Sequence, residues 1–202
     1  MTIRAVVFDI GGVLEFCGPM DFEKVWEPKL GLAEGSMDTA MQDMWVGGAI
    51  GTVTEAEVHA AMRDRLGITE EQVEAVMADM WQRYLGSPNT ELIEYAGALR
   101  RRVRTGILSN SFVGAREREQ AAYGLPALVD ECLYSHEVGI GKPDPELWKL
   151  TCERMGVEPA ELLFVDDVQV NITAARAYGI RAVLFENTAQ VIAEIEAALR
   201  GE

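Results

Sequence analysis

Five short apolar segments alternate along this chain with longer amphipathic segments. The apolar segments are rich in β-branched residues and predict strands at residues 3–10, 103–108, 132–134, 162–165 and 181–185. The amphipathic segments predict helices at residues 90–102, 145–155, 171–178 and 188–199. Strands that alternate with helices in this way form parallel βαβ units. The sequence therefore predicts an α/β fold, a Rossmann-like parallel sheet with helices on both faces.

One long segment interrupts this alternation. Between about Met20 and Leu85 we find only helical periodicity, with candidate helices at residues 22–30, 37–45, 54–66 and 69–85. The segment leaves the predicted sheet just after its first strand and returns before its second. We therefore expect a small all-helical cap at residues 18–86, inserted into a core made of residues 1–17 and 87–202.

Charge and cysteine content narrow the classes of function. Among 202 residues, 33 are acidic and 18 are basic, and the formal net charge of −15 argues against binding to nucleic acid or to anionic membranes. The three cysteines form no CxxC pair, and no segment is typical of a signal peptide or a membrane span. We predict a cytoplasmic protein with no nucleic-acid or membrane partner, whose oligomeric state the sequence does not determine.

Polar residues follow four of the predicted strands, close to the point where each strand ends. They are Asp9, Ser109-Asn110, Lys142 and Asp166-Asp167. Ligands of parallel α/β sheets bind beyond the carboxyl ends of the strands, so we expect these side chains to share one crevice. A single Asp after a strand is usually a turn or cap residue, and the prediction therefore depends on the whole set.

The same segments resemble, in chain order, the four signature motifs of the haloacid dehalogenase-like hydrolases. The matching segments are VVFDIGGVL, ILSNS, GKPDPELW and FVDDVQVNITAARAYGI. The last two are most similar to the phosphatase domain of mammalian soluble epoxide hydrolases and to related bacterial sugar phosphatases. The motif spacing and the helical insert extend the resemblance over essentially the whole chain.

This resemblance implies a Mg²⁺-dependent phosphatase that acts on a small phosphorylated metabolite through an aspartyl-phosphate. Asp9 is then the nucleophile, and Lys142 keeps Asp9 ionised and holds the phosphoryl oxygens. The resemblance also implies that Ser109 and Asn110 donate hydrogen bonds to the phosphate. It implies three metal ligands, which are Asp9, the Gly11 carbonyl and Asp167. Asp166 and Asn171 would orient these ligands.

The first motif departs from the family pattern at Gly11. Members of the family commonly carry there a second Asp that acts as general acid and base, a role that typically contributes about 10²- to 10⁴-fold in rate. Three explanations are open: the substrate has a good leaving group, another residue such as Glu15 or a cap residue supplies the proton, or the protein binds without turnover.

Two other functions compete with the phosphatase hypothesis. A 2-haloacid dehalogenase would use the same Asp9 without a metal, but it would not need paired acids at 166 and 167, and no Arg follows the first motif. A non-catalytic ligand-binding protein is supported by Gly11 alone.

His59 and His136 lack partners at metal-ligand spacing and are expected to be structural. Cys17 is expected to be a structural thiol near the crevice.

Overall fold

A computed structural model describes residues 2–201 and contains a five-stranded parallel sheet. Its strands are β1 (Ala5–Phe8), β4 (Arg104–Ser109), β5 (Glu131–Tyr134), β6 (Leu162–Asp166) and β7 (Arg181–Leu184). The order across the sheet is β5-β4-β1-β6-β7, so β1 lies in the centre and pairs with both β4 and β6. The predicted fold class is confirmed, and each strand lies within a few residues of its expected range.

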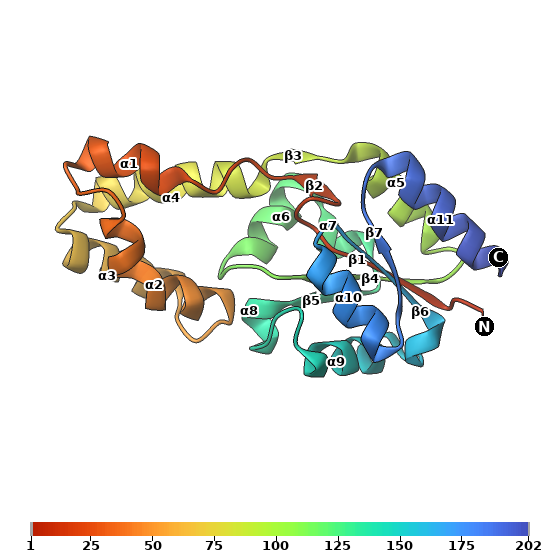
Figure 1. The fold of residues 1–202 in the computed structure, drawn as a ribbon. Coiled ribbons are helices and arrows are strands. Elements are labelled where there is room, and N and C mark those ends of the chain that lie inside the picture. Colours follow the sequence, from red (N-terminus) through yellow and green to blue (C-terminus); the bar gives the residue numbers. More distant parts are fainter. Residues whose placement is uncertain (1, 202) are drawn as a thin grey trace.

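Helices cover both faces of this sheet because successive strand residues point to opposite sides. Val6 and Phe8 of β1 belong to one hydrophobic cluster, with residues of α5 (Thr90–Leu99) and α11 (Thr188–Arg200). Ala5 and Val7 belong to the other, with residues of α9 (Pro145–Met155) and α10 (Gln169–Tyr178). Figure 1 shows the two helix pairs on opposite sides of the strands. Shorter elements complete this part: α6 (Ala115–Tyr123), α7 (Leu125–Leu128), α8 (Ser135–Val138) and a 3-10 turn, Pro159–Glu161.

Four helices form a separate lobe at one end of the molecule (Figure 1). They are α1 (Phe22–Leu30), α2 (Ser36–Ala49), α3 (Glu55–Leu66) and α4 (Glu70–Leu85). We call α1–α4 the helical lobe and the remainder the sheet lobe. Thr54 and Thr69 begin α3 and α4 with capping boxes, and buried methionines such as Met41 and Met62 fill the space between the helices. In residues 2–201, no helix is long and apolar enough to cross a membrane.

A two-stranded antiparallel sheet, which the sequence did not predict, joins the lobes. β2 (Glu15–Phe16) pairs with β3 (Ser87–Pro88) where the chain passes into the helical lobe and where it returns. The lobes also contact each other directly, because Phe112 of the sheet lobe belongs to the hydrophobic cluster of the helical lobe. The exact limits of the cap, residues 18–86, stay a prediction.

Candidate active site

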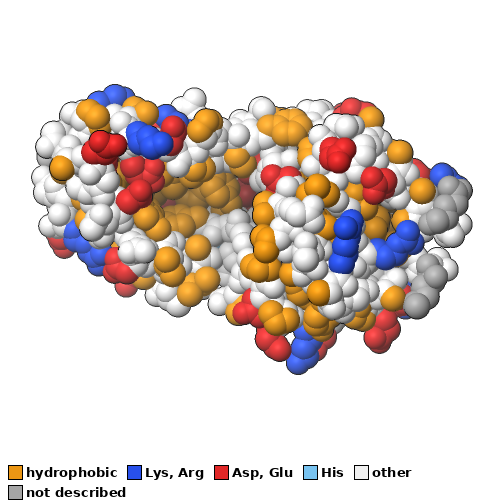
Figure 2. Space-filling view, in the orientation of Figure 1, with side chains coloured by type: hydrophobic (Ala, Val, Ile, Leu, Met, Phe, Trp, Pro, Cys, Tyr) orange, Lys and Arg blue, Asp and Glu red, His pale blue; other side chains and the backbone are white. Residues whose placement is uncertain are grey.

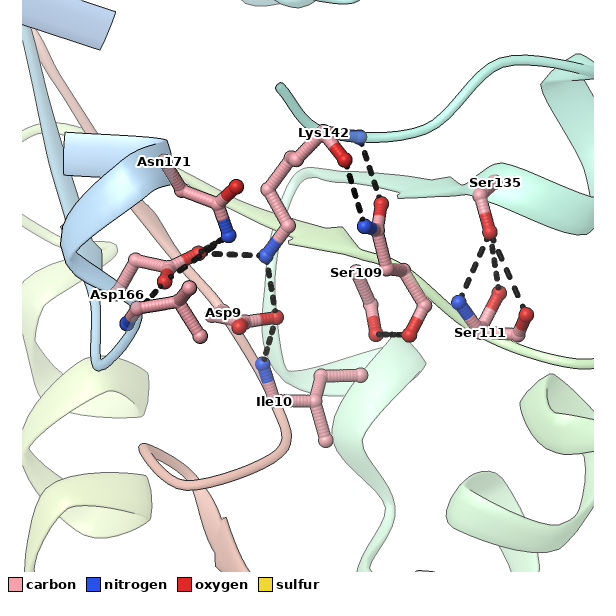
Figure 3. Close-up of polar contacts among 10 residues, drawn as sticks. Asp9, Ile10, Ser109, Ser111, Ser135, Lys142, Asp166 and Asn171 are labelled. Atoms are coloured by element: carbon pink, nitrogen blue, oxygen red, sulfur yellow. Dashed lines mark hydrogen bonds and ion pairs between the residues drawn. The ribbon is translucent and has the colours of Figure 1, made fainter. Parts of the chain in front are cut away.

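A lysine lies between two buried carboxylates at the carboxyl ends of β1 and β6. The Lys142 Nζ atom is 2.8 Å from Asp9 Oδ1 and 2.6 Å from Asp166 Oδ2, and all three residues are almost completely buried. Figure 3 shows the Lys142 side chain reaching from its loop to both carboxylates. A buried charge is costly unless it is paired, so this arrangement holds each of the three charged groups in one position.

Both oxygens of Asp166 are used within the protein. The Val168 amide donates to Oδ1 at 2.7 Å, and Asn171 Nδ2 lies 3.2 and 3.1 Å from the two oxygens, in addition to the Lys142 bond (Figure 3). Asp166 therefore orients Lys142 and the start of α10, and Asn171 in turn fixes Asp166.

The loop that carries Lys142 is held by Asn110. The Lys142 amide donates to Asn110 Oδ1 at 2.7 Å, and Asn110 Nδ2 donates to the Lys142 carbonyl at 2.9 Å. One hydrogen of the Asn110 amide group is left for another acceptor, since an NH₂ group carries two. Ser109 is buried, and among the described residues its hydroxyl makes only a long contact of 3.4 Å with the Asn110 carbonyl. Asn110 thus lies beside Lys142, Ser109 precedes it at the end of β4, and neither predicted phosphate donor is fully committed to other groups among the described residues.

The electrostatic balance at Asp9 depends on Lys142. Burial raises the pKa of Asp9, the Lys142 ammonium opposes that shift, and the nearby Asp166 carboxylate adds to it. The Ile10 amide also donates to Asp9 Oδ1, at 2.8 Å, and favours the ionised form. A cation beside Asp9 is therefore needed for it to carry its negative charge at neutral pH.

Asp167 lies close to the other two acids, and the backbone makes room for it at Gly12. One carboxylate oxygen from each of Asp9, Asp166 and Asp167 lies within 4.8 Å of the others. Gly12 has φ +76°, and a Cβ there would lie 2.2 Å from Asp167 Oδ2. Burial and the charge of Asp166 raise the pKa of Asp167. Only glycine fits at position 12 without displacing this carboxylate.

These groups open onto a cavity of about 620 Å³, which we call the strand-end cavity. Five of the predicted site residues line it, among other side chains: Asp9, Asn110, Lys142, Asp167 and Asn171. The backbone of Gly11 also reaches it. Ser109 and Asp166 are buried and do not line the cavity, but Asp166 contacts the lining residues Lys142 and Asn171. The structure thus brings the sequence-predicted set together at one edge of the sheet.

The side of Gly11 on which a side chain would project faces Cys17. The Cys17 Sγ atom is 3.3 Å from the position of a Cβ on Gly11. Burial raises the pKa of the Cys17 thiol to about 12, so it stays neutral. A weakly acidic thiol therefore occupies the region toward which an acid at position 11 would point.

Glu15, the alternative acid near Gly11 in the sequence, lies behind the cavity wall. It is 1% exposed and is absent from the lining residues of the strand-end cavity. Burial and the neighbouring Glu119 raise the pKa of Glu15 to about 9, so it holds a proton at neutral pH. Glu15 is therefore protonated and could act as an acid, but it does not line the strand-end cavity.

Glu119 of α6 is a buried acid that the sequence analysis missed. The Tyr134 hydroxyl donates to its Oε2 at 2.5 Å, while its Oε1, like Glu15 Oε2, has no hydrogen-bond partner among the described residues. Burial raises the pKa of Glu119 to about 7. No sequence signal could have identified this residue, because the surrounding segment AREREQ is typical of a solvated helix face.

Neither histidine lines the strand-end cavity, and their structural role stays a prediction. His136 Nδ1 is 2.6 Å from Ser111 Oγ, beside the contact between the lobes, and its ring packs against Tyr134. His59 lies on α3 in the helical lobe. Neither belongs to a metal-binding cluster among residues 2–201.

A central parallel sheet, acidic and basic groups at its strand ends, and an inserted helical lobe define a class of α/β hydrolases with a carboxylate-rich centre. The chain belongs to the haloacid dehalogenase-like hydrolase family, whose sequence model matches residues 3–179. The chain is therefore a hydrolase of this family, and the predicted resemblance is confirmed.

Curated relatives include both phosphatases and a dehalogenase. A phosphatase of Mycobacterium tuberculosis is 38% identical over 95 residues, which is 46% of this chain and 43% of the relative. Bifunctional epoxide hydrolase 2 of Sus scrofa is 26% identical over 97% of this chain and 39% of its own length. (S)-2-Haloacid dehalogenase 1 of a Pseudomonas species is 34% identical over 39% of this chain and 35% of the relative. The chain thus spans about two-fifths of the length of the first two relatives.

Solved structures share the fold over nearly the full chain. A HAD-family enzyme of Bacteroides thetaiotaomicron superimposes with a TM-score of 0.80 at 22% identity, covering 95% of this chain and 99% of the other. The same enzyme was solved with magnesium and inorganic phosphate, with a TM-score of 0.75 at 21% identity over 94% of this chain and 98% of the other.

Proposed function

We propose that this hydrolase is a Mg²⁺-dependent phosphatase that cleaves small phosphate monoesters through an aspartyl-phosphate on Asp9. The observation that carries the proposal is the position of Lys142, which lines the strand-end cavity and whose ammonium contacts Asp9. A phosphate dianion entering that cavity meets a fixed cation beside a nucleophile. The phosphatase relatives, and the neighbour solved with magnesium and phosphate, support the same chemistry.

In the first step Asp9 attacks phosphorus. Asp9 Oδ1 is already held by Lys142 and by the Ile10 amide, so Oδ2 is the oxygen that forms the new bond. The bond between phosphorus and the leaving oxygen breaks, and that oxygen keeps the electron pair as an alkoxide. Lys142 and the free hydrogen of the Asn110 amide stabilise the charge on the phosphoryl oxygens. Without an acid at Gly11, the alkoxide takes its proton from water in the cavity.

In the second step a water oxygen attacks the phosphorus of the aspartyl-phosphate. The bond between phosphorus and Asp9 Oδ2 breaks, Asp9 returns to its carboxylate form, and the product leaves as dihydrogen phosphate with both protons of the water. Lys142 stays beside Oδ1 throughout and favours the ionised form of the regenerated carboxylate.

The acidic residues fit a magnesium ion. Asp9, Asp166 and Asp167 offer oxygens within 4.8 Å of one another, and Mg²⁺ prefers oxygen ligands. Because the oxygens of Asp166 are bonded to Lys142, Asn171 and the Val168 amide, Asp9 and Asp167 are the acids that would hold the ion, together with the Gly11 carbonyl. When bound, the ion would offset the repulsion between Asp9 and an incoming phosphate.

The competing dehalogenase function is supported by the dehalogenase relative. The geometry favours it less, because the described lining residues of the strand-end cavity include one lysine and no arginine to receive a halide and a carboxylate. Asp167, which has no ion pair among the described residues, would also have no metal to hold in a reaction that needs none.

One set of assays on the purified protein can distinguish the phosphatase, the dehalogenase and the non-catalytic binding protein. We expect phosphate release from acetyl phosphate and p-nitrophenyl phosphate with Mg²⁺, loss of that activity in EDTA, and recovery when Mg²⁺ is returned. Halide release from 2-chloropropionate without phosphate release would establish the dehalogenase instead. Release of neither product, by protein shown to bind Mg²⁺, would indicate a non-catalytic binding protein.

A further inference from the structure

A second cavity lies between the two lobes, and its walls are mostly apolar. It has a volume of about 240 Å³ and six apolar or aromatic lining residues: Met20, Phe22, Trp45, Met80, Tyr84 and Phe112. Figure 2 shows a hollow between the lobes with hydrophobic side chains in its depth. We call this space the interlobe cavity. Its volume lies below the usual range of roughly 300–1,000 Å³ for ligand pockets, so it suits a group about the size of one ring.

The interlobe cavity adjoins the strand-end cavity. Asn110 lines both cavities, and Ser111 and Phe112, which follow it directly, line the interlobe cavity. A phosphoryl group held at Asp9 and Lys142 would therefore direct its ester substituent past Asn110 toward the interlobe cavity.

The few polar groups of the interlobe cavity restrict the charge of that substituent. Glu23 lines it, and none of its described lining residues is Lys or Arg. A negatively charged substituent would thus meet a carboxylate and find no cation. The Trp45 Nε1 donor is buried and has no hydrogen-bond partner among the described residues, so a neutral acceptor on the substituent could pair with it. A polyhydroxylated sugar would leave most of its hydroxyls unpaired against apolar walls.

We propose that the substrate is a phosphate monoester of a compact, apolar alcohol that carries no negative charge, with its apolar part bound in the interlobe cavity. The inference deepens the phosphatase proposal and rests on it. It assigns Glu23 as a residue that excludes acidic substrates.

Binding of non-hydrolysable phosphonates tests the proposal on the complete chain in Mg²⁺. Calorimetric titration would compare methylphosphonate, benzylphosphonate and 4-carboxybenzylphosphonate, which share one head group. We expect benzylphosphonate to bind about tenfold or more tightly than methylphosphonate, as is typical when an apolar pocket is filled, and the carboxylate to remove that gain. Equal binding of methyl- and benzylphosphonate, or undiminished binding of the carboxylated compound, would overturn the proposal.

Two matched variants test the charge exclusion. Glu23→Gln removes a carboxylate from the cavity wall, while Glu34→Gln removes one from an exposed turn of the same lobe outside the cavity. We expect Glu23→Gln to restore binding of 4-carboxybenzylphosphonate several-fold and Glu34→Gln to leave it unchanged. Equal effects of the two variants would refute the role of Glu23. Circular dichroism would verify that both variants are folded.

Acetyl phosphate separates failure of this inference from failure of the proposed function. Its acetyl group is too short to fill the interlobe cavity, so its hydrolysis depends on the strand-end cavity alone. Turnover of acetyl phosphate without any preference for benzylphosphonate would reject the substrate class and keep the phosphatase. Absence of acetyl phosphate turnover would reject the phosphatase itself.

Discussion

Both lobes bury acidic side chains, but they use them differently. In the helical lobe, Glu27 is 2% exposed, and its two oxygens accept hydrogen bonds of 2.8 Å from the amides of Gly35 and Met37 at the start of α2. In the sheet lobe, Asp9 is 7% exposed, and only its Oδ1 is bonded to the groups that hold it, Lys142 and the Ile10 amide.

The difference shows which buried acids are candidates for chemistry. Glu27 is fully used in closing a turn and lines neither cavity, so its role is structural. Asp9 lines the strand-end cavity, its Oδ2 is not used by the groups that hold Oδ1, and Lys142 lowers its pKa against the effect of burial. Burial alone does not identify a catalytic acid. A buried acid is a candidate when one of its carboxylate oxygens is left unbonded beside a cavity.

The largest expected effect follows from removing that free oxygen. Asp9→Asn should reduce turnover of p-nitrophenyl phosphate by at least about 10³-fold, because an amide cannot form the aspartyl-phosphate. The measurement is kcat with Mg²⁺, on protein whose circular dichroism matches the parent. Asp79→Asn, a change of the same kind in the helical lobe, is the control and should keep the parent rate. Residual activity of Asp9→Asn within tenfold of the parent would remove Asp9 from the nucleophile role.

The next effect concerns Gly11, where the sheet lobe lacks an acid. We expect kcat/KM to fall steeply as the leaving-group pKa rises across a series of aryl phosphates, by about 10²- to 10⁴-fold between good and poor leaving groups. Gly11→Asp combined with Cys17→Ala, which clears the space in front of position 11, should flatten this dependence. A flat dependence in the parent would show that a residue of either lobe already supplies the proton.

A smaller effect distinguishes acids that hold the metal from groups that orient them. Asp167→Ala should weaken Mg²⁺ binding more than Asn171→Ala, since Asp167 has no Lys or Arg ion pair among the described residues, while Asn171 acts through Asp166. Loss of an orienting group typically costs about 10- to 100-fold in metal affinity. Calorimetric titration with Mg²⁺ provides the comparison. The assignment fails if Asp167→Ala binds Mg²⁺ as tightly as the parent.

The smallest effect lies at Glu119, an acid that has one oxygen without a hydrogen-bond partner among the described residues and lines neither the strand-end nor the interlobe cavity. Its folded pKa, about 7, exceeds its ordinary value of 4.5, so the folded protein keeps a proton that the unfolded chain releases. The free energy of unfolding should therefore fall as pH rises from 4.5 to 7, by at most about 1.4 kcal/mol per pH unit from this group. Below pH 4.5 both states are protonated and the contribution is constant.

Urea unfolding at pH 5, 6 and 7 would measure this dependence. Glu119→Gln should flatten it, because an amide does not titrate, whereas Glu117→Gln on the exposed face of α6 should leave it unchanged. Glu119 also contributes to the raised pKa of Glu15, so Glu119→Gln lowers the pKa of Glu15 as well, whereas burial keeps that pKa raised in both variants. Identical pH slopes for the Glu119 and Glu117 variants would contradict a protonated Glu119.

The sequence by itself determined the five strands of the parallel sheet, the helices of the helical lobe and the order of the site residues. The buried strands are short segments rich in β-branched residues. Helices α3 and α4 begin at Thr54 and Thr69, because the side chains of these two threonines cap the first turn of each helix. Asp9 and Lys142 were predicted because parallel strands end at one edge of the sheet. These features depend on local chemistry or on a topological rule that holds for any parallel sheet.

Only the tertiary structure decided how distant segments meet. The β2–β3 pair, the thiol of Cys17 in front of Gly11, and the meeting of Glu15 with Glu119 all require residues far apart in sequence or a particular backbone path. Helix α6 was missed because its inward residues, Ala115 and Glu119, include a charged one. The interlobe cavity depends on how the lobes pack, and packing is set by the fit of many side chains at once, which no local pattern encodes.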